Sequence, residues 1–194
     1  MSTLLLSVPG SESHWQDREI KKSTVVVTEL PLEDPLQDDA EREHHIPQLS
    51  NLPNITHIIS SPYQDLSNQL DLRPLATPSR LLAIALSSLA VTRADYATAP
   101  YLEIFNWSSV FGTLRTLCSQ AGIEWQVQEF HVVIFRSQLR KEADRRRLGE
   151  LDQKSHEEAC ASGGLLKYWF GSCDEQRRNL ATCTFVLTSA PIKR

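Results

Sequence analysis

The stretch QVQEFHVVIFRSQL, at residues 126–139, decides the fold class of this chain. It is a long run of β-branched and aromatic residues, a composition that is typical of a β-strand. Successive side chains of a strand point to opposite faces, and residues 130–135 are almost all apolar, so both faces would be apolar there. We therefore expect a central strand in a sheet that is covered on both sides.

A helix and two more strands are predicted after the long strand. Residues 148–161 have helical character and are followed by Gly163-Gly164, a pair that favours the end of a helix. The apolar runs at 165–171 and 179–187 flank a short polar turn, which predicts an antiparallel hairpin. The order strand, helix, strand, strand is half of a ferredoxin-like sandwich and makes the expected fold class α+β.

A clear helix and a short strand are expected ahead of the long strand. Residues 110–121 carry apolar side chains at helical spacing, and Gly122 follows them as a natural stop. The run YLEIF at 101–105 predicts a short strand. The apolar stripe of the helix must pack against the sheet or against another helix.

Residues 81–91 (LLAIALSSLAV) fit two kinds of element. Their leucine and alanine content favours a helix, whereas the alternation of Leu82, Ile84 and Leu86 favours a strand. We favour a helix that begins after Pro78-Ser79, with a strand as the alternative.

The N-terminal part of the chain differs in composition from the rest. Residues 1–73 contain six of the ten prolines, and residues 29–43 carry seven carboxylates against one arginine. Such an acidic run cannot bury enough apolar surface to offset the entropy of ordering it. We predict that residues 1–72 form a mostly irregular arm with one short strand at 23–30, and that residues 73–194 form the α+β domain.

Composition and charge exclude several classes of protein. The net charge is −4, which argues against nucleic acid as the main partner. No window of eighteen residues is apolar, and the N-terminus has no basic region ahead of its three leucines, so no membrane partner and no signal peptide are expected. The sequence predicts a soluble protein of the cytoplasm, with the nucleus as the alternative compartment.

No cofactor or metal is expected from the motifs. The four cysteines include no C-x-x-C pair, and we interpret them as small buried hydrophobic residues, except for Cys173, which lies in a predicted turn. No disulfide framework is expected in a chain of this length without a secretion signal. His44 and His45 are adjacent and would point in different directions, with no third ligand near them. The sequence contains no phosphate-binding loop and no dinucleotide glycine fingerprint.

Several blocks of residues 73–183 together resemble a family of uncharacterised fungal proteins. The block SHEEACASGGLLKYWFG, at residues 155–171, is the most specific of them, and RPLATPSRLLAIALSSL, DYATAPYLEIFNWSSVF, EFHVVIFRSQL and RNLATC support it. The resemblance implies a dimeric α/β-barrel architecture, in which ferredoxin-like units pair through their sheets, and it carries no assigned activity. The family usually continues after RNLATC with a helix and a last strand, where this chain has TFVLTSAPIKR. The resemblance therefore implies a unit that is incomplete at its C-terminal end and lacks its fourth strand.

Two classes of function are open on this reading. The first is a small-molecule enzyme or carrier with a pocket between sheet and helices, and the second is a non-catalytic interaction protein or a truncated, inactive homologue. Whether the chain is an enzyme is left open. The partners considered are a second copy of the chain, through the sheet, and a small molecule. The candidate catalytic residues are His131, His156, Asp152 and Tyr168.

Asp152 and His156 are the best acid–base candidates because they lie one helical turn apart. We expect Leu148, Leu151, Ser155 and Ala159 to form the stripe that faces the core, with the Asp–His pair at its border. A carboxylate at this spacing would favour the protonated imidazole and raise the pKa of His156 above its usual value of about 6.5.

Overall fold

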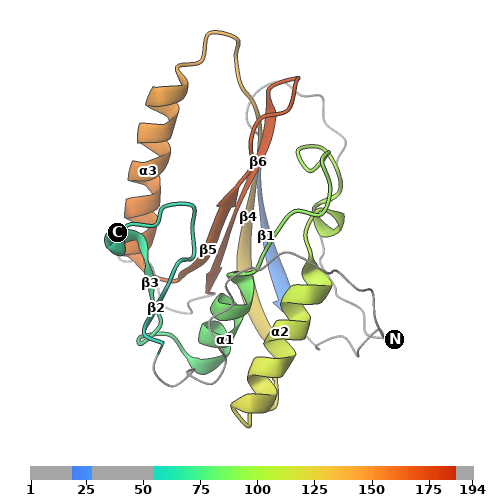
Figure 1. Ribbon diagram of the computed structural model, residues 1–194, viewed down its shortest axis with the longest axis vertical. Helices are drawn as coiled ribbons and strands as arrows, with labels where there is room; N and C mark the ends of the chain where they lie inside the picture. Colours follow the sequence, from blue (N-terminus) through green and yellow to red (C-terminus); the bar gives the residue numbers. More distant parts are fainter. Residues whose placement is uncertain (1–18, 28–54, 187–194) are drawn as a thin grey trace.

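Residues 19–27 and 55–186 are described by the computed structural model of the chain, which has an α+β architecture (Figure 1). A four-stranded sheet has the order β1-β4-β6-β5, and every pair of neighbours is antiparallel. A two-stranded sheet, β2-β3, lies beside it. The acidic run at 29–43, the pair His44-His45 and the C-terminal residues 187–194 fall outside the described residues.

The strands and helices of the described residues follow one another in this order: β1 (Glu19–Val27), β2 (His57–Ile58), β3 (Leu70–Asp71), α1 (Thr77–Leu86), α2 (Trp107–Gln120), β4 (Gln128–Gln138), α3 (Arg145–Ser162), β5 (Leu165–Phe170) and β6 (Arg178–Val186). Two short 3-10 helices, η2 (Leu66–Asn68) and η3 (Tyr101–Glu103), lie in the connections. No helix among the described residues is both long and apolar enough to cross a bilayer.

The long strand is central, as its sequence predicts. β4 pairs with β1 along one edge and with β6 along the other, and Phe130, Val132, Val133 and Ile134 are buried. The predicted hairpin is confirmed, because β5 and β6 pair antiparallel across a polar turn. β5 contains a register shift between Leu165 and Lys167, a bulge that re-aims the side chains at the start of the strand.

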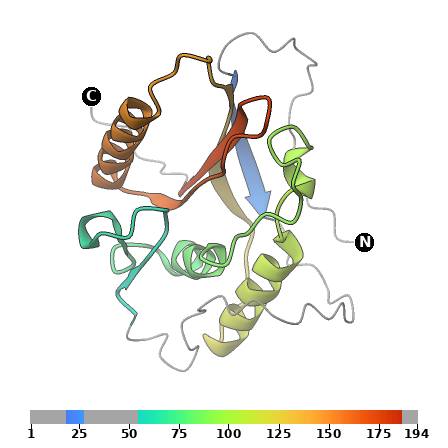
Figure 2. The ribbon, with the colours of Figure 1, turned by 45° about the horizontal axis from the view of Figure 1, so that its top comes forward.

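Helices lie on both sides of the sheet (Figure 2). α1 and α2 cover the face that carries Phe130, Val132 and Ile134, and these side chains join those of both helices in one apolar core. We call this the α1/α2 face. The opposite face carries His131, Val133 and Phe135 of β4 and Tyr168 of β5, and α3 packs against it chiefly at β5. We call this the α3 face.

The ends of the helices follow their local sequence. α1 begins at Thr77 with Pro78 in its first turn, where the missing N–H is not needed, so the helical interpretation of residues 81–91 holds to Leu86. α2 ends ahead of Gly122, whose φ of 63° only glycine adopts readily. The carboxylate of Asp144 accepts a hydrogen bond from the N–H of Arg147 and so caps α3.

Two expectations about local structure are wrong. Residues 101–103 form a 3-10 helix, and only Phe105 of the predicted strand makes a β-bridge, with Val91. β1 pairs with β4 from the N-terminal side and gives the sheet four strands, and the expected lack of a last strand after RNLATC stays a prediction. The packed region also begins before Arg73, because Ile58 and Leu72 are buried in the same core. Strand pairing and long-range packing leave no periodic signal in short segments, which is why the sequence did not show them.

The inward face of α3 also differs from the prediction. Leu151 of the expected apolar stripe is 45% exposed and Ser155 is exposed, whereas His156 is buried. Hydrogen bonds to the neighbouring segments satisfy the polar groups that this helix turns inward. Leu148 and Ala159 of the stripe are half-buried, so the inward side of α3 is displaced towards His156 from the side that apolar spacing indicates.

Lys167 is a lysine in the interior of β5, next to Thr184 of β6. Only 9% of its surface is exposed, and none of the described residues forms a hydrogen bond or an ion pair with its ammonium group. Burial lowers the pKa of Lys167 from 10.5 to about 8, because the charged form loses its hydration. The folded chain therefore carries an unfavourable charge at neutral pH.

We predict that Lys167→Met stabilises the chain by about 1–3 kcal/mol at pH 7, since methionine fills similar space without a charge. In the parent chain, the unfolded state binds more protons than the folded state between about pH 8 and pH 10.5. Its free energy of unfolding should therefore rise across that window, and this rise should be absent from the variant. Urea unfolding at several pH values measures both effects. Lys154→Met, at an exposed position of α3, is the control and should change little; a Lys167 variant that is less stable at pH 7 would contradict the prediction.

Candidate functional site

A polar and aromatic cluster lies where α3, β5 and the segment at residues 60–63 meet. We call it the α3–β5 cluster, and its members are Ser61, Tyr63, Asp152, His156, Cys160, Tyr168 and Phe170. Asp152, His156 and Cys160 are spaced four residues apart on α3, which places them on one side of the helix. Tyr168 and Phe170 alternate along β5 and therefore share a face of the strand.

The segment at residues 60–63 is held against the open edge of β5 by a backbone contact. The N–H of Tyr168 donates to the carbonyl oxygen of Ser60 at 2.8 Å. This hydrogen bond extends the sheet locally and protects its edge. It also brings Ser61 and Tyr63 to α3, about ninety residues later in the sequence, where both bond to the helix.

His156 is the most deeply buried polar member of the cluster, with 3% of its surface exposed. Its ring stacks on Tyr63, at a centroid distance of 5.1 Å, and on Tyr168, at 5.5 Å. Its Nε2 lies 3.0 Å from the hydroxyl oxygen of Ser61 and 3.4 Å from the Sγ atom of Cys160. Burial lowers the pKa of His156, and the nearby carboxylates of Asp152 and Glu157 oppose this effect only in part. The imidazole is therefore neutral at pH 7.

The predicted upward shift of the His156 pKa is thus wrong in sign. The spacing of Asp152 and His156 was read correctly, but the carboxylate of Asp152 bonds to two phenols and not to the imidazole. The loss of hydration on burial then outweighs the attraction between the two groups. The burial of a helix face depends on the segments that pack over it, and the sequence of the helix alone does not identify those segments.

Asp152 links the two tyrosines of the cluster through hydrogen bonds. Tyr63 donates its O–H to Oδ2 of Asp152 and Tyr168 donates its O–H to Oδ1, both at 2.5 Å. Burial and the adjacent carboxylate raise the pKa values of both tyrosines, because a phenolate beside Asp152 would be repelled by it. Both phenols therefore stay neutral donors over the physiological range, and the side chain of Asp152 is half-buried between them.

The cluster contains one thiol, that of Cys160, and a second thiol, that of Cys183, lies near Asp152. Cys160 contacts His156, and burial raises its pKa. Burial and the charge of Asp152 raise the pKa of Cys183, on β6, to about 12. Both thiols are protonated at pH 7, and neither has the lowered pKa of a reactive cysteine. All four cysteines are free.

Three of the four candidate residues predicted from sequence come together here, namely His156, Asp152 and Tyr168. His131 does not join them: it lies on β4, paired with Phe185 of β6, so that β6 separates it from β5. Ser61, Tyr63, Cys160 and Phe170 were missed, the first two because residues 1–72 were interpreted as an arm. Over the described residues, no group of three histidine, cysteine or acidic side chains is arranged to hold a metal ion.

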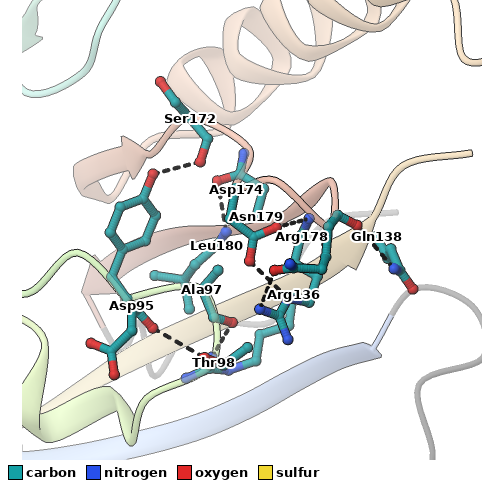
Figure 3. Close-up of polar contacts among 12 residues, drawn as sticks. Asp95, Ala97, Thr98, Arg136, Gln138, Ser172, Asp174, Arg178, Asn179 and Leu180 are labelled. Carbon is teal, nitrogen blue, oxygen red and sulfur yellow. Dashed lines mark hydrogen bonds and ion pairs between the residues drawn. The ribbon is translucent and has the colours of Figure 1, made fainter. Parts of the chain in front are cut away.

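A second set of polar contacts, at another part of the sheet, anchors a loop (Figure 3). The guanidinium of Arg136 donates to the carbonyl oxygen of Ala97. It also donates to the carbonyl oxygen of Ala99, and the O–H of Tyr96 donates to the carbonyl of Ser172. Asp174 pairs with Arg178 beside them. These donors and acceptors satisfy one another within the chain, so we interpret this set as a structural anchor for residues 92–100.

Comparison with known proteins identifies the family of this chain. The family described as PB2B2.08-like matches residues 59–190. This chain belongs to that family. A member from Schizosaccharomyces pombe, the UPF0643 protein PB2B2.08, is 34% identical over 142 residues, which are 70% of this chain and 64% of the relative. The chain thus spans about 64% of the length of that curated relative. No solved structure matches.

The family match contains every residue of the α3–β5 cluster and excludes β1. The fungal resemblance read from the sequence is therefore confirmed at the level of the family. The family is uncharacterised, so the chemistry of the cluster has to be argued from its own contacts.

We predict that the imidazole of His156 titrates below 6.5 in the folded chain. Because the unfolded state then binds more protons, the contribution of His156 to stability is complete above about pH 6.5 and is lost as the pH falls through the folded pKa. The Asp152→Asn variant should lower the His156 pKa further, since it removes the charge that favours the imidazolium. NMR titration of the imidazole resonances in both proteins tests this, and a His156 pKa above 6.5 would refute it.

Proposed function

We propose that this chain binds a small molecule at the open side of the α3–β5 cluster, where Tyr63, Asp152 and Phe170 reach the surface. The observation that supports this most is the pair of hydrogen bonds from Tyr63 and Tyr168 to Asp152. They hold one carboxylate in a set orientation between aromatic rings, and ligand sites typically combine apolar and aromatic walls with a few fixed polar groups.

The aromatic part of the site is partly open to solvent. Phe170 is 37% exposed, and its ring lies 5.7 Å from that of Tyr168 and 6.3 Å from that of Tyr63. An exposed phenylalanine beside a half-buried carboxylate offers a ligand apolar contact and a charge at the same place. The proposal therefore assigns the contact with ligand to Phe170, Tyr63 and Asp152.

His156 has a positioning role in this proposal. Its ring is covered on both sides by tyrosines, so a ligand at the surface would not touch it. The imidazole holds the two phenol rings apart and keeps Ser61 against α3. We assign no reaction to the cluster, and the catalytic role considered for His131, His156, Asp152 and Tyr168 is replaced by ligand binding at Asp152 with support from His156 and Tyr168.

A ferredoxin-like half unit is the architecture that we propose for the second part of the chain. β4, α3 and β5 form a β-α-β unit with β6 inserted between its two strands, which is the split arrangement of ferredoxin-like folds. β1 would occupy the place beside β4 that the last strand of a complete unit takes.

We predict that a thermal-shift screen of cationic, neutral and anionic small molecules finds a ligand that depends on Phe170. A ligand at 100 times its Kd would add about 2.7 kcal/mol of stability. Phe170→Ala should weaken binding and leave the fold intact, because Phe170 is partly exposed. Val127→Ala is the matched control, since Val127 is an apolar side chain with 59% exposure outside the cluster. Equal binding by the parent chain and the Phe170→Ala variant would place the ligand elsewhere.

Self-association through the sheet is the second candidate function, and the α3 face favours it. α1 and α2 cover the other face, whereas His131, Phe135 and Ala181 on the α3 face are only half-buried within one chain. A pair of chains joined there would bury these side chains further. Sedimentation equilibrium should then give twice the chain mass of 21.9 kDa, and Phe135→Glu should restore the single mass. A single-chain mass at all concentrations would exclude the dimer.

A further inference from the structure

The charge of the α3–β5 cluster indicates one class of ligand. We propose that the chain binds a small organic cation, an amine in its ammonium form or an N-methylated ammonium, between the carboxylate of Asp152 and the rings of Tyr63 and Phe170. This inference rests on the proposed function and names the chemistry of its ligand.

Asp152 differs from other acidic residues of the structure in its partners. Glu150, two residues earlier on α3, pairs with Arg146 at 2.6 Å and Arg147 at 3.2 Å. Among the described residues, the other acids in ion pairs are also neutralised by arginines, namely Asp71, Asp95, Glu103 and Asp174. Within the described parts of the chain, Asp152 has only neutral donors, the O–H groups of Tyr63 and Tyr168. Its negative charge is therefore stabilised by hydrogen bonds but not cancelled.

The other titratable groups of the cluster do not supply the missing positive charge. His156 is neutral at pH 7, because burial lowers its pKa. The pKa values of Tyr63, Tyr168 and the thiols of Cys160 and Cys183 are raised, so these groups are neutral as well. The cluster therefore carries a net charge of about −1 at neutral pH, supplied by one carboxylate.

The aromatic rings add to the same electrostatic preference. The faces of phenyl and phenol rings carry partial negative charge, which attracts an organic cation placed over them. The Phe170 ring is tilted by 56° against both Tyr63 and Tyr168, so the rings do not all stack flat on one another. An exposed ring beside an uncancelled carboxylate favours a cation over a neutral molecule and repels an anion.

The carboxylate also has capacity left for a ligand. A carboxylate can accept about four hydrogen bonds, and the two phenols use one on each oxygen. Asp152 is half-buried, and the inference places the ligand at its remaining acceptor positions. A primary ammonium could donate to them directly, whereas a quaternary ammonium would rely on charge and on contact with the rings.

The test uses methylammonium and tetramethylammonium as probes, with tert-butyl alcohol as a neutral probe of similar shape. NMR spectra of the full chain are recorded during each titration, and the ring resonances of His156 and Phe170 are followed. We expect saturable shifts of these resonances with both cations and none with the alcohol.

Asp152→Asn should weaken the affinity for the cations by about tenfold or more, the factor that corresponds to losing one interaction with a charged group. Glu150→Gln removes a carboxylate from the same helix, two residues away, and should leave the affinity unchanged. Phe170→Ala should also weaken cation binding, and because its side chain is partly exposed it keeps the test decisive if the Asp152 variant does not fold.

Equal shifts with the alcohol would overturn the choice of a cation and leave the proposed binding site intact. Unchanged cation affinity in both Asp152→Asn and Phe170→Ala would likewise overturn the inference, and so would an equal loss in Glu150→Gln, which would reflect only the overall charge of α3. A chain that binds no small molecule of any charge in the thermal-shift screen would remove the proposed function itself, so the two failures are distinguishable.

Discussion

The hydrogen bonding of β4 along both edges is the constraint on which the rest of the structure depends. A strand whose side chains are buried must pair its backbone groups, because unpaired N–H and C=O groups are costly away from water. β1 and β6 satisfy the two edges of β4, and α1 and α2 cover one of its faces. The chain thus brings a strand from its N-terminal region into the same sheet as its C-terminal hairpin.

Backbone groups at the outer edge of β5 also need partners, and the segment that supplies one of them forms part of the candidate site. β5 is the outermost strand, and the carbonyl of Ser60 accepts a hydrogen bond from its Tyr168 N–H. Once this segment lies beside β5, Ser61 and Tyr63 reach α3 and complete the cluster. The contact that protects this edge strand therefore also assembles the site, which joins residues 60–63 to α3, about ninety residues later in the sequence, and to β5.

The cluster combines an acidic side chain with a buried imidazole whose pKa is lowered. Two phenols donate hydrogen bonds to the half-buried carboxylate of Asp152, whereas burial lowers the pKa of His156, which lies deeper. Neutral hydrogen bonds stabilise a charge without cancelling it. The matched family region, residues 59–190, includes all of these residues, and the curated fission yeast relative shares 34% identity over its aligned part. The family therefore provides further chains in which to look for the same carboxylate and rings.

Much of the fold could be predicted from the sequence, because its main elements have strong local signals. The apolar run of β4, the helical stripe of α2 and the polar turn between β5 and β6 each specify an element within a few residues. The α+β class followed from their order, and the spacing of Asp152 and His156 placed them on one side of a helix. These are short-range properties, and backbone geometry determines them directly.

Tertiary structure decided what lies over each face. The pairing of β1 with β4, the docking of residues 60–63 on β5 and the inward side of α3 all join segments far apart in the sequence, for which no short-range pattern exists. The pKa of His156 is lowered, and not raised as was expected, for the same reason. Burial of the imidazole by Tyr63 and Tyr168 outweighs the effect of a carboxylate one helical turn away. The sequence by itself determined the elements and the candidate residues on α3 and β5, and only their packing decided which side chains are buried, charged and open to a ligand, because burial and desolvation are properties of the assembled fold.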